Sequence, residues 1–358
     1  MPKVLIAPLD WGLGHATRCI PLIESFRLHG WEITIAADGH IALLLNKTFP
    51  DIPVLQLPGY RIRYAKSFIW MHIIQQIPRI RKMIGYEKKW LKEQYDKGRW
   101  DVIISDNRPG FFHQDAYNIY ITHQLNIKTG LGHWANWIAT RMHRQHIRNF
   151  DIVWVPDRRD SVLSGALSTS TVFPVPVNYI GPISRIRPEP VNKSSYDILF
   201  MLSGPEPQRS LFEKKIFDQI KPSHGKIALV RGTTDALQKI VVPKNVDCID
   251  LAGGADISRL MNDARLVICR SGYSSLMDLV RLSKKALLIP TSGQGEQKYL
   301  AERAEQQGFF PFMTQHDFDL DKALKKASHF SFSSAFNSID FDLHHQVIGA
   351  LTKNHWAD

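Results

Sequence analysis

The segment from residue 263 to residue 278 holds the residue types best suited to chemistry in this chain. The apolar run Leu266–Cys269 predicts a buried strand, and Ser271 with Gly272 predicts a tight turn directly after it. A helix is expected to follow, with Ser274 as its N-cap. Because a helix N-terminus presents free N–H groups and a partial positive charge, this turn is suited to binding a phosphate.

A second strand and helix start come soon afterwards. Ala286–Pro290 predicts another buried strand, and the polar loop Gly293–Gln297 opens the next helix. Asp278, one helical turn beyond Ser274, places a carboxylate where it could bind sugar hydroxyls. Since ligands of open α/β sheets bind at the carboxyl ends of the strands, both strand ends are expected to serve one binding site.

The first strand of the chain also ends in a Gly-rich turn. Gly12 and Gly14 permit a tight turn before a helix that starts near His15. The helix N-terminus disfavours the cationic form of this histidine, which keeps it neutral and able to act as a base near pH 7. Alternatively, His15 only caps the helix. A dinucleotide fingerprint with Asp38 as the ribose-binding acid is a third interpretation, but Thr17 occupies the position of its third glycine.

Length and composition indicate a globular protein of two domains. The 358 residues exceed one ordinary core, and the apolar fraction of 44% with 22% charged residues is usual for a soluble protein. Three cysteines without a Cys-x-x-Cys spacing favour a reducing, cytosolic setting. Neither a signal peptide nor a membrane-spanning run is expected from the sequence.

Strands and helices alternate in both halves, which predicts α/β domains with doubly wound parallel sheets. In the first half the predicted strands are Val4–Pro8, Glu32–Ala36, Val102–Ser105, Ile119–Thr122 and Ile152–Val155. In the second half they are Asp197–Leu202, Lys226–Val230, Val246–Ile249, Leu266–Cys269 and Ala286–Ile289. The polar residues 183–195 are predicted to link a domain of residues 1–182 to a domain of residues 196–334.

Taken in order, these motifs resemble those of the GT-B glycosyltransferases, most closely the MurG-type family that transfers N-acetylglucosamine to a membrane lipid. The segment Gly12–His15 resembles the N-terminal Gly-rich loop of that family, and Ser203-Gly204 matches the first turn of its second domain. Its donor-binding turn is similar to Cys269–Gly272 followed by Asp278, and its sugar-recognising loop is similar to residues 290–297.

The resemblance implies a GT-B fold, in which two Rossmann-like domains face a central cleft and a tail helix, here residues 335–358, returns to the first domain. On the acceptor side it implies roles for Gly12, Gly14, Arg18 and His123. It implies donor binding by Ser203, Gly204, Arg270, Ser271, Gly272, Tyr273, Ser274, Asp278, Gln294, Glu296 and Gln297.

The reaction implied by the resemblance is a metal-independent, inverting transfer from a UDP-sugar, with UDP-N-acetylglucosamine as one candidate. The helix after Gly272 would stabilise the departing diphosphate, and His15 would take the proton of the acceptor hydroxyl. Asp106, at the end of another strand, either orients His15, holds the acceptor or only terminates its strand. No metal and no cofactor are expected.

Several positions depart from the pattern of the family. Asp278 stands where the family usually has Glu, and Lys298 follows Gln297 where a second Gln is typical. Leu13 and Arg18 replace a Gly and a Pro in the N-terminal loop. These differences leave the identity of the sugar and of the acceptor open.

Two clusters allow a metal-dependent alternative. The Asp-x-Asp spacing of residues 317–321 is used by the other main transferase fold, but acidic residues at a helix N-terminus are the simpler interpretation. His143 and His146 are spaced to share one helix face, and no further ligand accompanies them, so both are predicted to be surface histidines.

Positive charge is concentrated in Tyr60–Arg99, which has 11 basic and three acidic residues, in a chain of net charge +11. Isoleucines recur at helical spacing at 69, 73, 77, 80 and 84. The pattern is typical of an interfacial helix on an anionic membrane, and equally of a helix that packs on the sheet with a solvated basic edge. A lipid-linked acceptor would favour the first, with the protein cytoplasmic and peripheral on the inner face of the membrane.

Three other functions compete with the transferase. A non-hydrolysing UDP-N-acetylglucosamine 2-epimerase has the same architecture, but it needs further acids around the sugar that cannot be assigned here. A nucleic-acid binder is suggested by the basic segment, although no recognition module or array of stacking aromatics is present in the sequence. The third is a catalytically silent subunit that recruits partners to a membrane.

Overall fold

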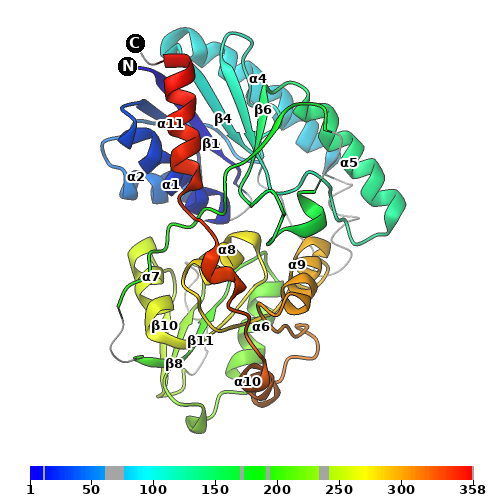
Figure 1. Ribbon diagram of the computed structural model, residues 1–358. Helices are drawn as coiled ribbons and strands as arrows, with labels where there is room; N and C mark the ends of the chain where they lie inside the picture. The colour runs from blue at the N-terminus through cyan, green and yellow to red at the C-terminus, as the bar shows by residue number, and fades with distance from the viewer. Residues whose placement is uncertain (11–12, 61–75, 170–172, 191–193, 234–241, 357–358) are drawn as a thin grey trace. The chain divides into compact units, whose positions relative to one another are not determined.

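The computed structural model describes residues 1–10, 13–60, 76–169, 173–190, 194–233 and 242–356. Among these residues the chain divides into two compact units. The N-terminal unit comprises residues 1–60, 76–185 and 340–356, and the C-terminal unit comprises residues 186–339. Both contain a parallel sheet with helices on it, which confirms the predicted α/β class (Figure 1).

The N-terminal unit is built on a seven-stranded parallel sheet in the order β3-β2-β1-β4-β5-β6-β7. Its strands are β1 (Lys3–Pro8), β2 (Glu32–Ala37), β3 (Val54–Gln56), β4 (Val102–Asp106), β5 (Tyr117–Ile121), β6 (Ile152–Val155) and β7 (Val177–Tyr179). Its described helices are α1 (Leu13–Leu28), α2 (Gly39–Thr48), α4 (Ile77–Gly98), α5 (His133–Ile147), the 3-10 turn η1 (Gly165–Leu167) and α11 (Leu343–Trp356).

Side chains of the central strands point alternately to the two faces of the sheet, and both faces are covered by helices. Val4 and Ile6 of β1 point into one core, with helices α1 and α2, while Leu5 and Ala7 point into another, with α4. Central parallel strands therefore read as continuous apolar runs, and this is the signal that located them in the sequence.

The tail helix α11 belongs to the N-terminal unit and runs beside α1 (Figure 1). Ile348 is fully buried in the same core as α1, and Trp31 Nε1 donates a hydrogen bond to Thr352 Oγ1 at 2.8 Å. The helix starts at Leu343 and not at residue 335, because Ala335–Ser338 form a separate 3-10 turn in the C-terminal unit.

The C-terminal unit is built on a five-stranded parallel sheet in the order β10-β9-β8-β11-β12. Its strands are β8 (Tyr196–Met201), β9 (Ile227–Val230), β10 (Val246–Ile249), β11 (Ala264–Cys269) and β12 (Ala286–Leu288). Its described helices are α6 (Gln208–Phe217), α7 (Gly254–Asp263), α8 (Tyr273–Arg281), α9 (Gly295–Gln306) and α10 (Leu320–His329), with 3-10 turns η2 (Pro222–His224) and η3 (Ala335–Ser338).

The segment predicted as a linker, residues 183–195, is not a free spacer throughout. Ile183 is buried in the core of the N-terminal unit, and Ile186 is also fully buried. The boundary between the units falls between residues 185 and 186, inside the predicted linker. None of the helices in the described part of the chain is long and apolar enough to cross a bilayer.

Candidate functional site

In the N-terminal unit, the strand register brings the ends of three strands together. Pro8 of β1 pairs with Asp106 of β4, and Asp106 pairs with Ile121 of β5. The turn after β1 leads into α1, so that His15 lies in the first turn of this helix. Asp106 and His15, which are 91 positions apart, thereby meet at the carboxyl edge of the sheet.

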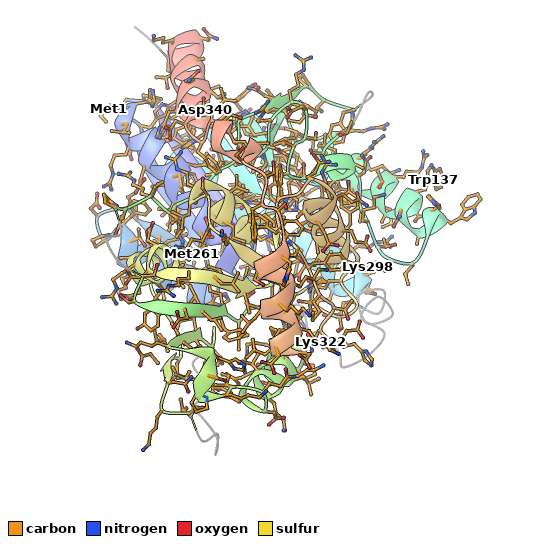
Figure 2. All side chains as sticks on the ribbon, turned by 60° about the horizontal axis from the view of Figure 1, so that its bottom comes forward. Met1, Trp137, Met261, Lys298, Lys322 and Asp340 are labelled. Carbon is orange, nitrogen blue, oxygen red and sulfur yellow. The ribbon has the colours of Figure 1, made fainter. Side chains whose placement is uncertain are left out.

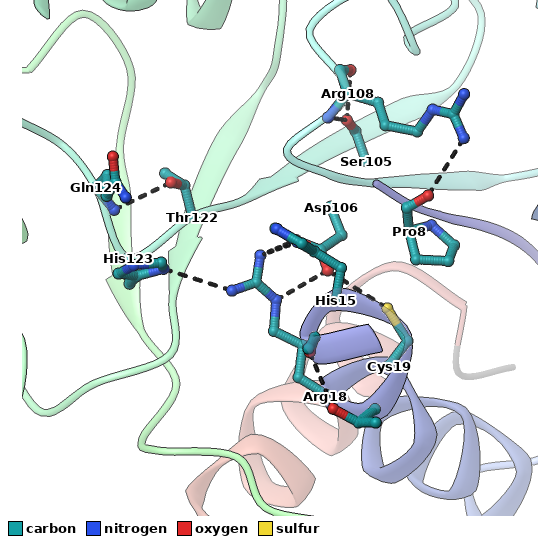
Figure 3. A network of polar contacts seen from close by, with 12 residues as sticks. Pro8, His15, Arg18, Cys19, Ser105, Asp106, Arg108, Thr122, His123 and Gln124 are labelled. Atoms are coloured by element: carbon teal, nitrogen blue, oxygen red, sulfur yellow. Dashed lines mark hydrogen bonds and ion pairs between the residues drawn. The ribbon is translucent and has the colours of Figure 1, made fainter. Parts of the chain in front are cut away.

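Three side chains, those of His15, Arg18 and Cys19, surround the buried carboxylate of Asp106 (Figure 3). Nδ1 of His15 lies 3.1 Å from Oδ1 of Asp106, and Nε of Arg18 donates to Oδ2 at 2.8 Å. Nη2 of Arg18 donates to Oδ1 as well, and the thiol of Cys19 lies 3.7 Å from Oδ2. On its other side, Arg18 has Nη1 at 3.5 Å from Nδ1 of His123.

The electrostatics of this cluster favour an ionised aspartate and a neutral histidine. Burial alone would raise the pKa of Asp106, but the charges of Arg18 and His15 and their hydrogen bonds hold it well below its ordinary value. For His15, burial and the charge of Arg18 outweigh the attraction of Asp106, so its pKa is lowered. The imidazole is therefore uncharged near neutral pH.

The tautomer of His15 depends on which partner its Nδ1 atom binds. The carboxylate of Asp106, which only accepts, lies 3.1 Å from Nδ1, and Nη2 of Arg18, which only donates, lies 2.8 Å from the same atom. In the tautomer that donates from Nδ1 to Asp106, Nε2 keeps a lone pair, and the His15 side chain retains 16% of its exposure. This arrangement can remove a proton from a bound hydroxyl, and Asp106 stabilises the imidazolium that results.

The other residues predicted for the acceptor side of this unit differ in burial and in their contacts. Arg18 and His123 are 4% and 5% exposed, and the guanidinium of Arg18 is bonded to Asp106. Arg18 thus holds the carboxylate of Asp106, and its predicted role on the acceptor side stays a prediction. The carbonyl of Gly14 accepts a hydrogen bond from the Thr17 hydroxyl in the first turns of α1, while Gly12 lies outside the described residues.

In the C-terminal unit, three strand ends lie level with one another. Cys269 of β11 pairs with Met201 of β8 and with Leu288 of β12. The loops that follow these strands, residues 202–207, 270–272 and 289–294, therefore leave the sheet at the same edge. The two helix openings predicted to serve one binding site are indeed adjacent.

Helix α8 starts two residues earlier than expected. Gly272 is its N-cap, with extended φ and ψ of −69° and 146°, so Ser274 is an interior residue and the predicted N-cap is wrong. Tyr273 is the first helical residue and its side chain is 3% exposed. A Cβ on Gly272 would meet open space apart from Ser275 Oγ at 4.0 Å, so a ligand could approach the backbone of this turn closely.

Arg270 is buried instead of lining an open site. Its Nη1 and Nη2 atoms donate to the carbonyls of Ile289 and Gln208, and its guanidinium lies 4.6 Å from the ring centre of Phe212. The side chain is 1% exposed, and burial lowers its pKa to about 10. Arg270 thus connects the start of α6 with the loop after β12, and its predicted role in donor binding stays a prediction.

A second set of hydrogen bonds fixes the loop after β12. The hydroxyl of Ser271 donates to the carbonyl of Gln297 at 2.7 Å, and the side-chain Oε1 of Gln297 accepts from the Thr291 N–H at 2.9 Å. The Thr291 hydroxyl has no partner among the described residues although the residue is 2% exposed. A Cβ added to Gly204 would lie 3.4 Å from this hydroxyl, so the two residues face each other.

Thr291 is the residue that the sequence analysis missed. Its only signal in the sequence is its place directly after Pro290, at the end of a strand. A buried hydroxyl without a partner is costly, and it lies beside the exposed turn of Ser203 and Gly204, where the backbone φ of Gly204 is +98°. The remaining predicted donor residues, Asp278 on α8 and Gln294 and Glu296 at the start of α9, are partly buried.

Two of the acidic residues in 317–321 lie at the N-terminus of helix α10. Asp319 is the N-cap of α10, and its side chain accepts from the Lys322 N–H at 2.9 Å, as the simpler interpretation predicted. Asp321 lies in the first turn of the same helix and forms an ion pair with Lys221. In the described part of the chain no three His, Cys, Asp or Glu side chains are grouped as metal ligands.

The prediction that His143 is a surface histidine is only partly right, because the residue is half-buried. Its ring packs edge-on against buried Tyr120, with 5.8 Å between ring centres, and its Nε2 has no partner in the described residues. Burial lowers the pKa of His143 to about 4. The i, i+3 spacing could not reveal this, because it places two residues on one helix face without saying whether that face is covered.

A half-buried histidine with a lowered pKa should make stability depend on pH. Between pH 6.5 and about 4 the unfolded chain takes up a proton at His143 that the folded chain does not, so stability falls as the pH drops through this window. His143→Phe should therefore shrink the difference in urea midpoint between pH 7 and pH 5. His133→Phe, at an exposed position of the same helix, is the control. An unchanged pH dependence in His143→Phe would contradict the assignment.

Comparison with known proteins gives one family match and a consistent set of folds. Residues 213–338 match the glycosyltransferase family 28 C-terminal domain. An uncharacterized glycosyltransferase of Methanosarcina mazei is 23% identical over 325 residues, which cover 86% of this chain and 84% of that protein.

Three solved structures share the fold over nearly the whole chain. The glycosyltransferase of kitacinnamycin has a TM-score of 0.70 at 13% identity and covers 99% of both chains. MurG of Acinetobacter baumannii has a TM-score of 0.59 at 13% identity, covering 99% of this chain and 100% of that one. The glycosyltransferase VinC, solved with dTDP, has a TM-score of 0.61 at 12% identity and covers 98% of both chains.

These findings confirm the resemblance proposed from the motifs. The chain has the fold of the GT-B glycosyltransferases, and its C-terminal unit carries a match to the C-terminal domain of glycosyltransferase family 28, which together support a glycosyltransferase of GT-B type.

Proposed function

We propose that this protein is an inverting glycosyltransferase that moves a sugar from a nucleotide diphosphate sugar to a hydroxyl group, with His15 as general base. The observation that carries the proposal is the contact of His15 Nδ1 with the ionised carboxylate of Asp106. In the tautomer that donates from Nδ1 to Asp106, Nε2 on the opposite side of the ring is unprotonated and can accept a proton. The match of residues 213–338 to a glycosyltransferase domain supports the donor half of the proposal.

The C-terminal unit would hold the donor. Backbone N–H groups at the start of α8, after Gly272, are suited to the diphosphate, and the helix end stabilises the negative charge that develops as the diphosphate leaves. Ser203, Gly204 and Thr291 lie at the same edge and offer small or polar contacts to the same group. In this proposal the reaction needs no metal.

The chemical step balances in one displacement. The oxygen of the acceptor hydroxyl forms a bond to the anomeric carbon, and the bond from that carbon to the diphosphate oxygen breaks. The proton of the hydroxyl passes to Nε2 of His15, and the electron pair leaves with the nucleoside diphosphate. Attack on the face opposite the leaving group inverts the configuration at the anomeric carbon.

The nucleotide is proposed to be UDP, and dTDP is the alternative that two similar structures raise, since VinC was solved with dTDP and the rhamnosyltransferase SpnG with thymidine diphosphate. The sugar is proposed to be N-acetylglucosamine or a close relative. A lipid-linked or glycan hydroxyl is proposed as the acceptor, without a further cofactor.

A thermal-shift series tests the donor assignment. UDP, UDP-N-acetylglucosamine and dTDP should each be added at millimolar concentration to the full chain, with AMP as the control nucleotide. A ligand present at about 100 times its Kd stabilises the native state by about 2.7 kcal/mol, which raises the Tm by several degrees. Stabilisation by UDP or dTDP but not AMP supports the proposal, and no shift with either pyrimidine nucleotide refutes it.

The hydroxyl of Thr291 gives a sharper variant for the same assay. Thr291→Val keeps the shape and removes an unpartnered buried polar group, so the free protein should be as stable as wild type or slightly more stable. If this hydroxyl serves the nucleotide sugar, the Tm shift with UDP should fall, in line with a loss of about 1 kcal/mol in binding. Ser292→Val, at the neighbouring exposed position, is the control. Equal shifts in all three proteins would exclude Thr291 from the site.

Membrane contact through residues 61–99 also stays a proposal. Residues 61–75 lie outside the described residues, and so does the start of the predicted interfacial helix. The described part, α4, buries Ile84, Trp90 and Leu91 and exposes a basic face. Its exposed basic side chains are Arg79, Arg81, Lys82, Lys88, Lys89, Lys92 and Lys97. Such a face can approach an anionic surface while the helix stays packed on the sheet.

A further inference from the structure

A cluster of exposed apolar side chains lies at the start of helix α5. Leu131, Trp134, Trp137 and Ile138 are 56%, 80%, 58% and 50% exposed. The side chain of Trp137 projects outward from α5 in Figure 2. Four large apolar side chains exposed within eight residues are unusual in a soluble protein, where exposed apolar residues are normally scattered singly.

The backbone under this cluster is fixed by side-chain hydrogen bonds. Asn136 Oδ1 accepts from both the N–H and the hydroxyl of Thr129 at 2.7 Å, and the same hydroxyl accepts from the Leu131 N–H at 3.1 Å. Thr140 Oγ1 accepts from the Ile127 N–H at 2.9 Å. The loop before α5 is thus tied to the helix at three points, so the apolar side chains are presented on a defined surface.

The helix face that carries the two tryptophans carries arginines further along α5. Trp134, Trp137 and Arg141 follow at helical spacing. Arg144 lies one turn further along the helix, and Arg148 is its C-cap. The guanidinium of Arg141 lies 5.9 Å from the ring centre of Trp137. One side of the helix therefore changes from aromatic to cationic within its own length.

The arginines line a groove of about 320 Å³, together with Trp137 and Phe173. Arg144 is held in this groove from two sides. Its guanidinium lies 5.4 Å from the ring centre of Phe173, and its Nη2 donates to Asn126 Oδ1 at 2.9 Å. A guanidinium held in this way is prepared to bind a phosphate oxygen with little loss of side-chain entropy.

The sequence segment that contains these arginines has no acidic residue. Residues 124–150 include Lys128 and three arginines of the groove, and no Asp or Glu. Arg81 and Lys88 of α4 lie close enough to His146 of α5 to lower its pKa, together with burial. Cations from both helices thus add to one positive potential, which attracts an anionic surface.

We propose that this α5 face, Leu131–Arg148 with Phe173, is a docking surface for an anionic lipid membrane. Tryptophan side chains favour the interface between water and hydrocarbon, and arginines favour lipid phosphates. In this arrangement Trp134 and Trp137 enter the headgroup region while Arg141, Arg144 and Arg148 bind phosphates. The surface is separate from the basic segment 61–99. The proposal deepens the membrane association in the proposed function, but it does not depend on the transferase activity.

Vesicle sedimentation with the full chain tests the proposal. Vesicles of phosphatidylcholine containing about one quarter phosphatidylglycerol should bind the protein at low salt, and vesicles of pure phosphatidylcholine should bind it far less. Trp134→Ser/Trp137→Ser should weaken binding by about tenfold or more, because both side chains leave water on binding. Arg141→Gln and Arg148→Gln should each weaken it by about fivefold. Neither tryptophan is buried, so the folded state should be unaffected.

Two controls separate this surface from others. Leu43→Ser removes an equally exposed apolar side chain on α2, and Lys89→Gln/Lys92→Gln removes exposed charge on α4. Neither should match the loss caused by the tryptophan pair. Unchanged vesicle binding in Trp134→Ser/Trp137→Ser would overturn the proposal, as would a wild-type dimer that this pair dissociates or binding of inorganic phosphate without binding of vesicles. UDP stabilisation measured on the same variants reports on the transferase proposal separately.

Discussion

His15→Ala should lower the turnover number by about 10²–10⁴, because a positioned general base contributes a factor of this size. The readout is release of the nucleoside diphosphate from whichever donor stabilises the protein most. Stabilisation of the variant by that nucleotide should equal that of wild type, since the residues proposed to bind it belong to the other unit. In wild type the rate should fall only below pH 6.5, because His15 acts as a base when neutral and its pKa is lowered.

The matched control is His40→Ala, at an exposed position of α2, which should retain full activity. Arg18→Met adds a second control on the mechanism. Removing the guanidinium raises the pKa of His15, since the charge of Arg18 is one of the causes that lower it, so the acid limb of the rate profile should move to higher pH. His15→Ala with the turnover of wild type would exclude this residue as the base.

Asp106→Ala should destabilise the protein by about 3–5 kcal/mol, which is the usual cost of removing one partner of a buried ion pair. The variant leaves the guanidinium of Arg18 buried at 4% exposure without its carboxylate. It also removes the acceptor that fixes Nδ1 of His15, so activity should fall with stability. Urea unfolding followed by tryptophan fluorescence measures the first effect, and the transfer assay measures the second.

A double variant separates the two effects of Asp106. In Asp106→Ala/Arg18→Leu the unpaired cation is gone, so about half or more of the lost stability should return, while activity should stay low because His15 is still unanchored. Recovery of activity together with stability would show that Asp106 stabilises the folded state and is not needed to orient His15. A single Asp106→Ala variant as stable as wild type would contradict the buried ion pair itself.

The sequence predicted the central strands well, because these strands are buried on both faces and their apolar runs are continuous. The short edge strands β3 and β7, of three residues each, were not predicted. Each contributes few hydrogen bonds and only partly buried side chains, so it leaves little periodic signal. The predicted start of α8 was wrong because Ser274 is a residue type that often caps helices. The observed N-cap is Gly272, which has no side chain to give such a signal.

Long-range partners account for what could not be predicted in the candidate site. That Asp106 is near His15 follows from two parallel strand ends, and it was one of the alternatives considered. That Arg18 is bonded to Asp106 and not exposed to a substrate depends on a residue 88 positions away. The same holds for Arg270, whose partners are carbonyls at 208 and 289. Burial, and hence the role of a cation, is decided by tertiary packing.

Hydrogen exchange of the full chain with and without UDP tests the central claim most directly, namely that the C-terminal unit binds the nucleotide through the three loops at the edge of its sheet. The account predicts slower amide exchange in residues 202–209, 270–276 and 291–297 when UDP is added, with His15→Ala giving the same pattern. Protection that spares all three segments, or no protection at a UDP concentration that shifts the Tm, would contradict it.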